Sequence, residues 1–202
     1  VTCNVNRNGD LITNMYLVAT LKSGARTNWG YVSRLGHAMI ESCKIEVGGS
    51  KIDEQYGDWL NVWDELTRET AHDVARDNMI GNVDVLTTLG GETTEEYTMY
   101  VPLKFWFNRN NGLALPLIAL QYHDVRVTIK IREACHLINY KGTTAPTVAN
   151  STMKDAYLLI DYVYLDSEER KRFAQAAHEY LIEQVQFTGD ETYNASNLKY
   201  RL

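Results

Sequence analysis

Residues 101–131, VPLKFWFNRNNGLALPLIALQYHDVRVTIKI, decide the fold, because two strand-like segments flank a turn and an apolar insert. Over 101–107 every second residue is Val, Leu or Phe, which is the period of a half-buried strand. The polar run 108–112 is rich in Asn and ends in Gly, residues that tolerate turn conformations. Alternation resumes over 122–131, so the sequence predicts a long amphipathic strand there.

The insert between these segments, residues 113–120, is almost wholly apolar. Such a run left in water would favour association, so other structure has to cover it. Pro116 makes the insert an unlikely central strand, because proline cannot donate a hydrogen bond to a neighbouring strand.

Alternating and β-branched segments recur along the rest of the chain. The eight strand candidates lie at 1–6, 10–21, 43–47, around 52, 101–107, 122–131, 156–165 and 179–187. Gly48-Gly49 separates two of them and predicts a hairpin. Segment 10–21 is apolar on both faces, which indicates a strand covered on both sides, and the dense run 156–165 is expected to be a central strand.

Helical spacing is confined to the connections. It predicts short helices over 58–70, where Asp58 is placed as the cap, over 71–80, and from a cap at Asp166 to about 177. The polar stretches 22–36, 81–97 and 139–153 read as loops and outward surfaces. Many strands joined by long irregular crossings predict an all-β, antiparallel jelly-roll (Greek-key) β-sandwich with short helices in the connections.

Charge and composition exclude several functional classes. The 202 residues carry a formal net charge of −6, which argues against direct contact with nucleic acid. No apolar run is long enough to span a membrane, and the start of the chain does not resemble a signal peptide. The widely spaced Cys3, Cys43 and Cys135 read as buried free thiols of a reducing compartment.

The sequence contains no motif of a catalytic, cofactor-binding or metal-binding site, so none of these is predicted. The five histidines form neither a His-x-His pair nor a His-Glu-x-x-His helix, and His123 and Asp124 would point to opposite faces of a strand. A carbohydrate-binding or cupin-like jelly roll is the alternative from another class, with Trp59, Trp63 and Trp106 as possible sugar platforms. Asn150 and Asn194 each begin an N-glycosylation sequon and are possible glycosylation sites.

Several blocks, in order, resemble the major capsid protein of the nucleocytoplasmic large DNA viruses. They are RNGDLI (7–12), IEVGGSKID (45–53), WLNVWDELT (59–67), VPLKFWF (101–107), GLALPLIALQYH (112–123), LDSEER (165–170) and HEYLIEQ (178–184). That family folds as two consecutive jelly rolls. The resemblance therefore implies that residues 1–190 are the first jelly roll, lacking an upstream segment that can hold the family's first strand, and that 191–202 lead into a second roll.

The resemblance also implies a structural role without catalysis. In that family three copies form a pseudo-hexagonal capsomer that tiles an icosahedral shell in the virion, assembled in the host cytoplasm. Expected partners are the chain itself, neighbouring capsomers and minor capsid proteins, with no membrane insertion even if a membrane lies beneath the shell. A minor capsid paralogue is a further alternative. Contacts between subunits or rolls are expected at Trp29, Tyr31, Trp106, Leu113, Leu115 and Leu117.

Overall fold

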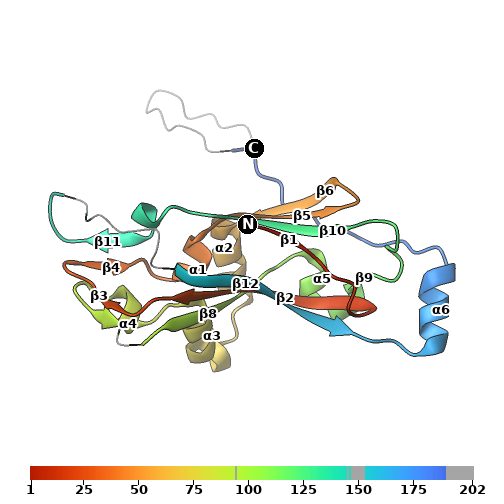
Figure 1. Ribbon diagram of the computed structural model, residues 1–202, viewed down its shortest axis with the longest axis horizontal. Helices are drawn as coiled ribbons and strands as arrows, with labels where there is room; N and C mark the ends of the chain where they lie inside the picture. Colours follow the sequence, from red (N-terminus) through yellow and green to blue (C-terminus); the bar gives the residue numbers. More distant parts are fainter. Residues whose placement is uncertain (94, 145, 147–152, 190–202) are drawn as a thin grey trace.

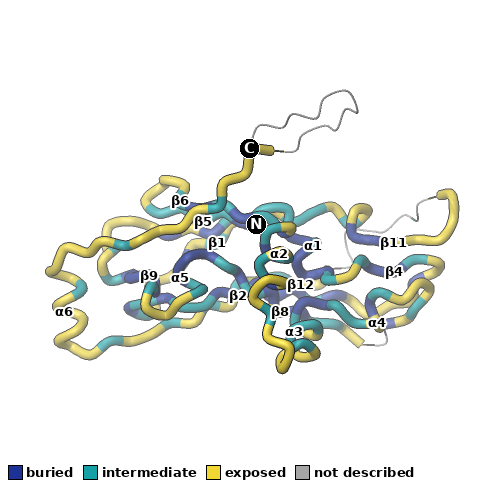
Figure 2. Tube along the Cα trace, turned by 180° about the vertical axis from the view of Figure 1, so that it is seen from behind, coloured by how far each residue is buried: buried dark blue, intermediate teal, exposed yellow. Residues whose placement is uncertain are grey.

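The computed structural model describes residues 1–93, 95–144, 146 and 153–189. Two antiparallel sheets lie face to face, and short helices sit in the connections and at the ends (Figure 1). Buried residues from both sheets form one hydrophobic cluster, which includes Ile45 and Val127 from one sheet and Leu17 and Met99 from the other. Figure 2 shows the buried segments along the strands, whereas α6 (Ser167–Gln175) is mostly exposed.

The first sheet has the order β1-β10-β5-β6. Its strands are β1 (Thr2–Asn4), β10 (Val125–Ile131), β5 (Ile40–Val47) and β6 (Ser50–Tyr56). Alternation in β10 buries Val125, Val127 and Ile129 at 0–3% exposure, as the sequence predicts. Gly48 and Gly49 join β5 to β6 with φ values of 58° and 83°, so the predicted hairpin glycines occupy the conformation that favours glycine.

The second sheet has the order β12-β2-β8. Its strands are β12 (Met153–Val163), β2 (Leu11–Leu21) and β8 (Tyr97–Pro102), and the short β9 (Leu115–Pro116) pairs with Leu11 and Ile12 of β2. Since β12 pairs along the whole of β2, β9 lies on the other edge of β2, in the same row as β8. The prediction that 10–21 is covered on both sides holds only in part, because the face with Met15, Leu17 and Ala19 is buried, whereas Tyr16 and Thr20 on the other face are half-buried.

Two short pairs of strands lie beyond one end of the main sheets (Figure 1). They pair β3 (Gly24–Ala25) with β7 (Glu92–Thr93), and β4 (Trp29–Tyr31) with β11 (Ile138–Tyr140). The predicted loops 22–36 and 81–97 therefore contain paired backbone and are not plain loops. Period-2 patterns of two or three residues are too short to reveal such strands in a sequence.

The helices lie in the connections. They are α1 (Leu35–Ala38), α2 (Gly57–Thr67), α3 (Asp73–Ile80), α4 (Asp84–Thr87), α5 (Trp106–Arg109) and α6, with 3₁₀ turns η1 (Thr70–His72), η2 (Asn111–Leu113) and η3 (Ala134–His136). Asp166 caps α6 as predicted, accepting hydrogen bonds from the N–H groups of Glu168 and Glu169. Asp58 does not cap α2, because the helix begins one residue earlier, after Tyr56.

The predicted strand over 101–107 is wrong in its position. β8 ends at Pro102, and α5 begins at Trp106. Phe105, Trp106 and Phe107 are all buried, so the segment has no solvent face on which a strand could alternate. The side chain of Asn108 accepts a hydrogen bond from the N–H of Phe105 (3.2 Å) and donates one to the carbonyl of Thr13 (2.8 Å), which fixes the turn against β2.

Two further strand predictions need correction. β12 is confirmed as a strand, but among the described residues it lies at the edge of its sheet and not in the centre. Residues 179–187 do not form a strand, and Leu181 and Phe187 are 75% and 54% exposed. This segment instead runs along β6, where the ring of Phe187 lies 4.6 Å from that of Tyr56.

Candidate assembly surfaces

The outward face of the β12-β2-β8 sheet carries a cluster of apolar and aromatic side chains, here called the tyrosine face. Residues paired across a sheet point to the same side, so the register defines two neighbouring rows. The rows are Tyr157-Val18-Tyr100 and Leu159-Tyr16-Pro102. The alternate residues of β2, Leu17 and Ala19, belong to the core, so these rows face away from it.

Several side chains of the tyrosine face remain open to solvent. Tyr157 is 48% exposed, Leu159 43% and Tyr100 39%. Val18 is 0% exposed although it lies outside the core cluster, because it sits between the two tyrosines of its row. Burial and the nearby carboxylate of Asp161 raise the pKa of Tyr16, which keeps its hydroxyl protonated as a hydrogen-bond donor. Tyrosine-rich apolar patches are typical of protein interfaces.

The outer edge of β12 is the second candidate surface. β12 pairs with β2 on one side only, and within the described part of the chain no strand pairs with its other side. Its inward residues Leu158, Ile160 and Tyr162 are only partly buried, whereas Met15 and Leu17 of β2 are 0% and 4% exposed. The core is therefore left partly uncovered beneath this edge.

The residues that the sequence predicts as contacts between subunits lie mostly inside the chain. Tyr31, Trp106, Leu115 and Leu117 are 7%, 4%, 6% and 1% exposed and belong to the core cluster, so little of their surface is free to touch another subunit. Trp29 and Leu113 are half-buried. The insert 113–120 is thus covered largely by the chain's own core, because Leu115 is drawn in where β9 pairs with β2.

The possible sugar platforms do not form one surface. Trp106 is buried, and the Trp63 ring lies 4.6 Å from the guanidinium carbon of Arg109. Trp59 lines an open groove together with Tyr56 and Phe187. His123, the nearest local suggestion of a metal ligand, packs against Gly48 at the hairpin.

A buried polar cluster lies between α1 and α2, which contribute His37 and Asp64. His37 and Asp64 are 2% and 1% exposed, and Asp64 forms an ion pair with Arg76 at 3.3 Å. Burial lowers the pKa of His37 to about 4, although the Asp64 carboxylate and the Asn61 side chain act in the opposite direction. The cluster is closed to solvent, so it fits a structural role in anchoring α2.

The sequence analysis missed one group of ligand-type side chains. Glu133, Cys135 and His136 bring their donor atoms within 4.8 Å of one another, and all three residues are exposed. The expectation of three buried cysteines is therefore wrong for Cys135, whereas Cys43 is buried and Cys3 is half-buried. The signal in the sequence is a Glu three residues before a His, with a Cys between them, within a polar turn.

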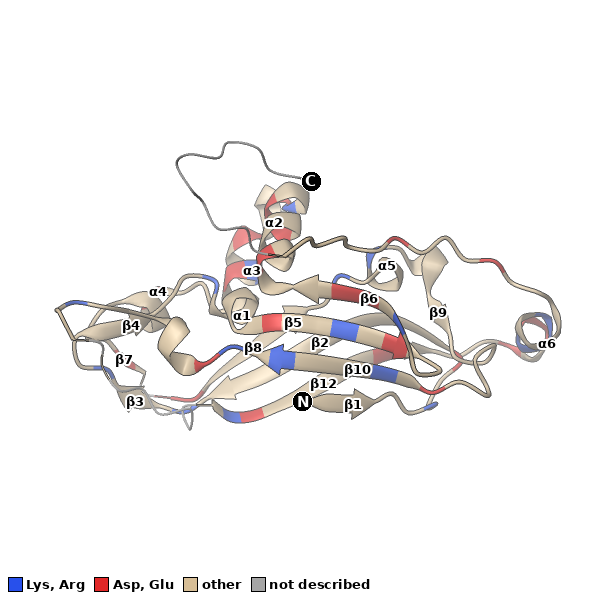
Figure 3. Cartoon of the chain, turned by 90° about the horizontal axis from the view of Figure 1, so that it is seen from above, with Lys and Arg blue, Asp and Glu red and all other residues tan. Residues whose placement is uncertain are grey.

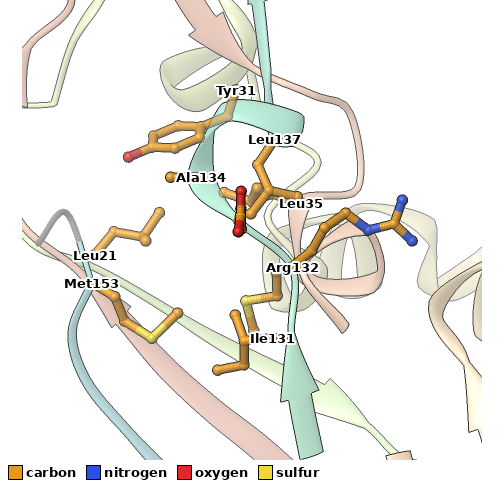
Figure 4. A pocket seen from close by; sticks show the side chains of 10 residues that line it. Leu21, Tyr31, Leu35, Ile131, Arg132, Ala134, Leu137 and Met153 are labelled. Atoms are coloured by element: carbon orange, nitrogen blue, oxygen red, sulfur yellow. The ribbon is translucent and has the colours of Figure 1, made fainter. Parts of the chain in front are cut away.

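The apolar cavity beside this group has a volume of about 250 Å³. Figure 4 shows Leu21, Tyr31, Leu137 and Met153 around it, while the guanidinium of Arg132 extends away from it. The lining is largely apolar, with Glu133 as its acidic residue, and one carboxylate without converging polar partners fits a packing defect at the end of the sandwich better than a site for chemistry.

Charged residues are distributed over the whole chain. In Figure 3, Lys and Arg positions are scattered along the elements and interspersed with Asp and Glu. Among the helices that the structure describes, none is long and apolar enough to cross a bilayer. Asn150 and Asn194 lie outside the described residues.

Comparisons with known proteins agree on one group. A family model described as the major capsid protein N-terminus matches residues 1–166. Capsid protein 1 of Acanthamoeba polyphaga mimivirus is 45% identical, over 100% of this chain and 37% of the relative. The major capsid protein of Pyramimonas orientalis virus is 45% identical, over 95% of this chain and 46% of the relative.

Solved structures agree with the sequence relatives. PBCV-1 VP54, fitted into a reconstruction of the virophage Sputnik, superposes with a TM-score of 0.79 at 36% identity, over 98% of this chain and 46% of that one. A quasi-atomic model of the PBCV-1 capsid gives a TM-score of 0.78 at 37% identity, over 95% of this chain and 44% of that one. This chain spans less than half the length of these relatives.

Proposed function

Because this chain belongs to the family of major capsid proteins of the nucleocytoplasmic large DNA viruses, we propose that the protein works by self-association into the shell of a virus particle. Three copies form a pseudo-hexagonal capsomer, and neighbouring capsomers and minor capsid proteins are its partners in the virion. Assembly takes place in the host cytoplasm. The work of the protein is then contact between surfaces, and it needs no reacting group.

The tyrosine face is the observation that carries this proposal. Its exposed side chains are held on a regular antiparallel sheet, so they lose little further conformational freedom when a partner covers them. Tyr100 and Tyr157 present large amphipathic rings with their hydroxyl groups available. We assign the tyrosine face to contacts between the subunits of the capsomer.

The strand order supports a jelly roll as the domain. Counting only described residues, one sheet has four strands and the other has three rows, since β9 shares the row of β8. A jelly roll has eight strands in two Greek keys. The eighth strand is assigned to a segment that precedes Val1 and pairs with the free edge of β12, residues 1–190 form the first roll, and 191–202 lead to a second.

Sedimentation velocity of the full-length protein at micromolar concentration tests the assembly proposal. A trimer is expected. Replacing Tyr157 and Leu159 together by Ser is expected to shift the protein to monomer while the far-ultraviolet circular dichroism is unchanged, because both side chains are exposed. The matched control replaces Leu66 and Val74 by Ser, which are 76% and 77% exposed on α2 and α3. A wild-type protein that stays monomeric contradicts the proposal.

A carbohydrate-binding role makes a different prediction for the same preparation. The groove with Trp59 would then bind glycans, and Trp59→Ala would abolish the binding. The shell proposal predicts no signal on a glycan array for either the wild-type protein or this variant.

A further inference from the structure

We propose that Glu133, Cys135 and His136 form a binding site for a zinc ion. The three residues fall within four positions of the chain, and their carboxylate, thiol and imidazole donor atoms lie within 4.8 Å of one another. The Cys135 thiol lies 3.7 Å from a carboxylate oxygen of Glu133. This site is independent of the proposed shell function, and it departs from the sequence-based expectation that the chain binds no metal.

The backbone of η3 brings the three side chains together. The N–H of His136 donates to the carbonyl of Glu133 (3.0 Å), which closes one 3₁₀ turn. With three residues per turn, residues i and i+3 of a 3₁₀ helix lie above one another, so Glu133 and His136 share a face. Cys135 reaches the same point from the adjacent position.

The turn is anchored at both ends. The N–H of Arg132 donates to the carbonyl of Met39 (2.8 Å), and the carbonyl of Leu137 accepts from the N–H of Val32 (3.0 Å). Leu137 itself is 7% exposed and belongs to the core cluster. The exposed ligand side chains therefore stand on a fixed backbone, which reduces the entropy that binding an ion would cost.

The donor set selects the kind of ion. Thiolate and imidazole suit zinc, whereas calcium and magnesium prefer sites made only of oxygen. Zinc bonds of about 2.0–2.3 Å place neighbouring ligand atoms roughly 3.5 Å apart in a tetrahedron. The observed spacing of up to 4.8 Å is wider than that value, so the exposed side chains would rotate toward the ion on binding.

Three protein ligands leave one of the four zinc positions open. Water can fill this position, and so can a donor from another protein chain. Glu133 and Ala134 also line the apolar cavity. A bound ion would therefore hold the wall of the cavity that η3 forms in one conformation.

Cobalt substitution and equilibrium dialysis test the site in the full chain under reducing conditions. One equivalent of Zn²⁺ per chain is expected, and Co²⁺ should give a thiolate charge-transfer band in the near ultraviolet with the intense visible bands of four-coordinate cobalt. Cys135→Ser should remove the charge-transfer band, and Cys135→Ser, His136→Gln and Glu133→Gln should each weaken zinc binding by ~10-fold or more.

Two matched controls show that the effect is local. Cys3→Ser and His72→Gln remove a cysteine and an exposed histidine elsewhere in the chain, and both should bind Zn²⁺ as the wild type does. Circular dichroism verifies that each variant is folded. The proposal is overturned if Co²⁺ gives no thiolate band, if Cys135→Ser binds Zn²⁺ unchanged, or if only the control variants lose the ion.

Discussion

The buried carboxylate of Asp53 accepts a hydrogen bond from the backbone N–H of Val185 at 3.0 Å, across 132 positions of the chain. Asp53 is 2% exposed, and its other oxygen accepts from the side chain of Gln55 (3.0 Å). One acidic side chain on β6 thus holds residues 179–189 against the sheet.

We expect Asp53→Ala to lower the free energy of unfolding by about 1–3 kcal/mol, because it leaves the N–H of Val185 without its acceptor and removes one of the two hydrogen bonds of the Gln55 amide, which also donates to the carbonyl of Lys104. Limited proteolysis should then cut the 179–189 segment earlier than in the wild type. Asp53→Asn keeps the oxygen for Val185 and should release the segment less. Equal cleavage of wild type and Asp53→Ala would contradict the assigned role.

Acid should destabilise the protein through His37. Its pKa in the folded chain is lowered from 6.5 to about 4, so the unfolded state binds the proton more readily between these pH values. Stability therefore falls as the pH drops through this window, by up to about 3 kcal/mol from this group. Urea unfolding at pH 7 and pH 4 measures the loss.

His37→Gln is the control for this pH effect, since it removes the titrating group. Its loss of stability between pH 7 and pH 4 should be smaller than that of the wild type. Parallel curves for the two proteins would show that the buried cluster of His37 and Asp64 does not carry the effect.

The three thiols should differ in reactivity. Burial raises the pKa of Cys43, and the side chain is 1% exposed, so little thiolate is present and a reagent cannot reach it. Cys135 is exposed and should react first with a disulfide reagent, followed by Cys3, whereas Cys43 should react only on unfolding. Mass spectrometry of partially labelled protein checks the order.

Trp106→Ala should act on stability and not on assembly. Trp106 is 4% exposed and packs edge-on against Phe107 with 5.0 Å between the ring centres, so its removal leaves a cavity that costs about 3–5 kcal/mol. Leu66→Ala, at a position 76% exposed, should cost no more than roughly 0.5 kcal/mol. Denaturant unfolding compares the two. If Trp106→Ala is as stable as the wild type but no longer forms trimers, Trp106 contributes to the contact between subunits and the prediction is wrong.

The sequence predicts the strands that alternate over a long range. β10 and the hairpin between β5 and β6 follow from period-2 burial and from two glycines with positive φ. Segment 101–107 fails because Trp106 stands at a position that a half-buried strand would give to solvent, and only tertiary packing decides that this position is buried. Segment 179–187 alternates equally well and runs along the edge strand β6, but its hydrogen bonds to β6 use the side chains of Gln184 and Asp53, so no backbone ladder forms.

The surfaces were harder to predict than the strands. A Tyr/Leu/Ile/Val strand such as β12 looks central in a sequence, because apolar residues on an outward face cannot be distinguished from apolar residues in a core. For the same reason the sequence predicts Leu115 and Leu117 in an interface, whereas both residues lie in the core. The group around Cys135 depends on a single 3₁₀ turn of three residues, which is too short to show a period in the sequence.

An unoccupied strand edge is also a template for wrong pairing between copies of a chain. Two irregularities interrupt β12, between Met153 and Asp155 and between Ile160 and Tyr162, and Lys154 and Asp161 place charges beside them. Only residues 155–160 of β12 thus have regular backbone with which another strand could pair. A strand that pairs out of register would meet an irregularity or a charged side chain at either end of this stretch. The edge of β12 therefore offers other copies of the chain only a short stretch of regular backbone, which discourages open-ended stacking of sheets.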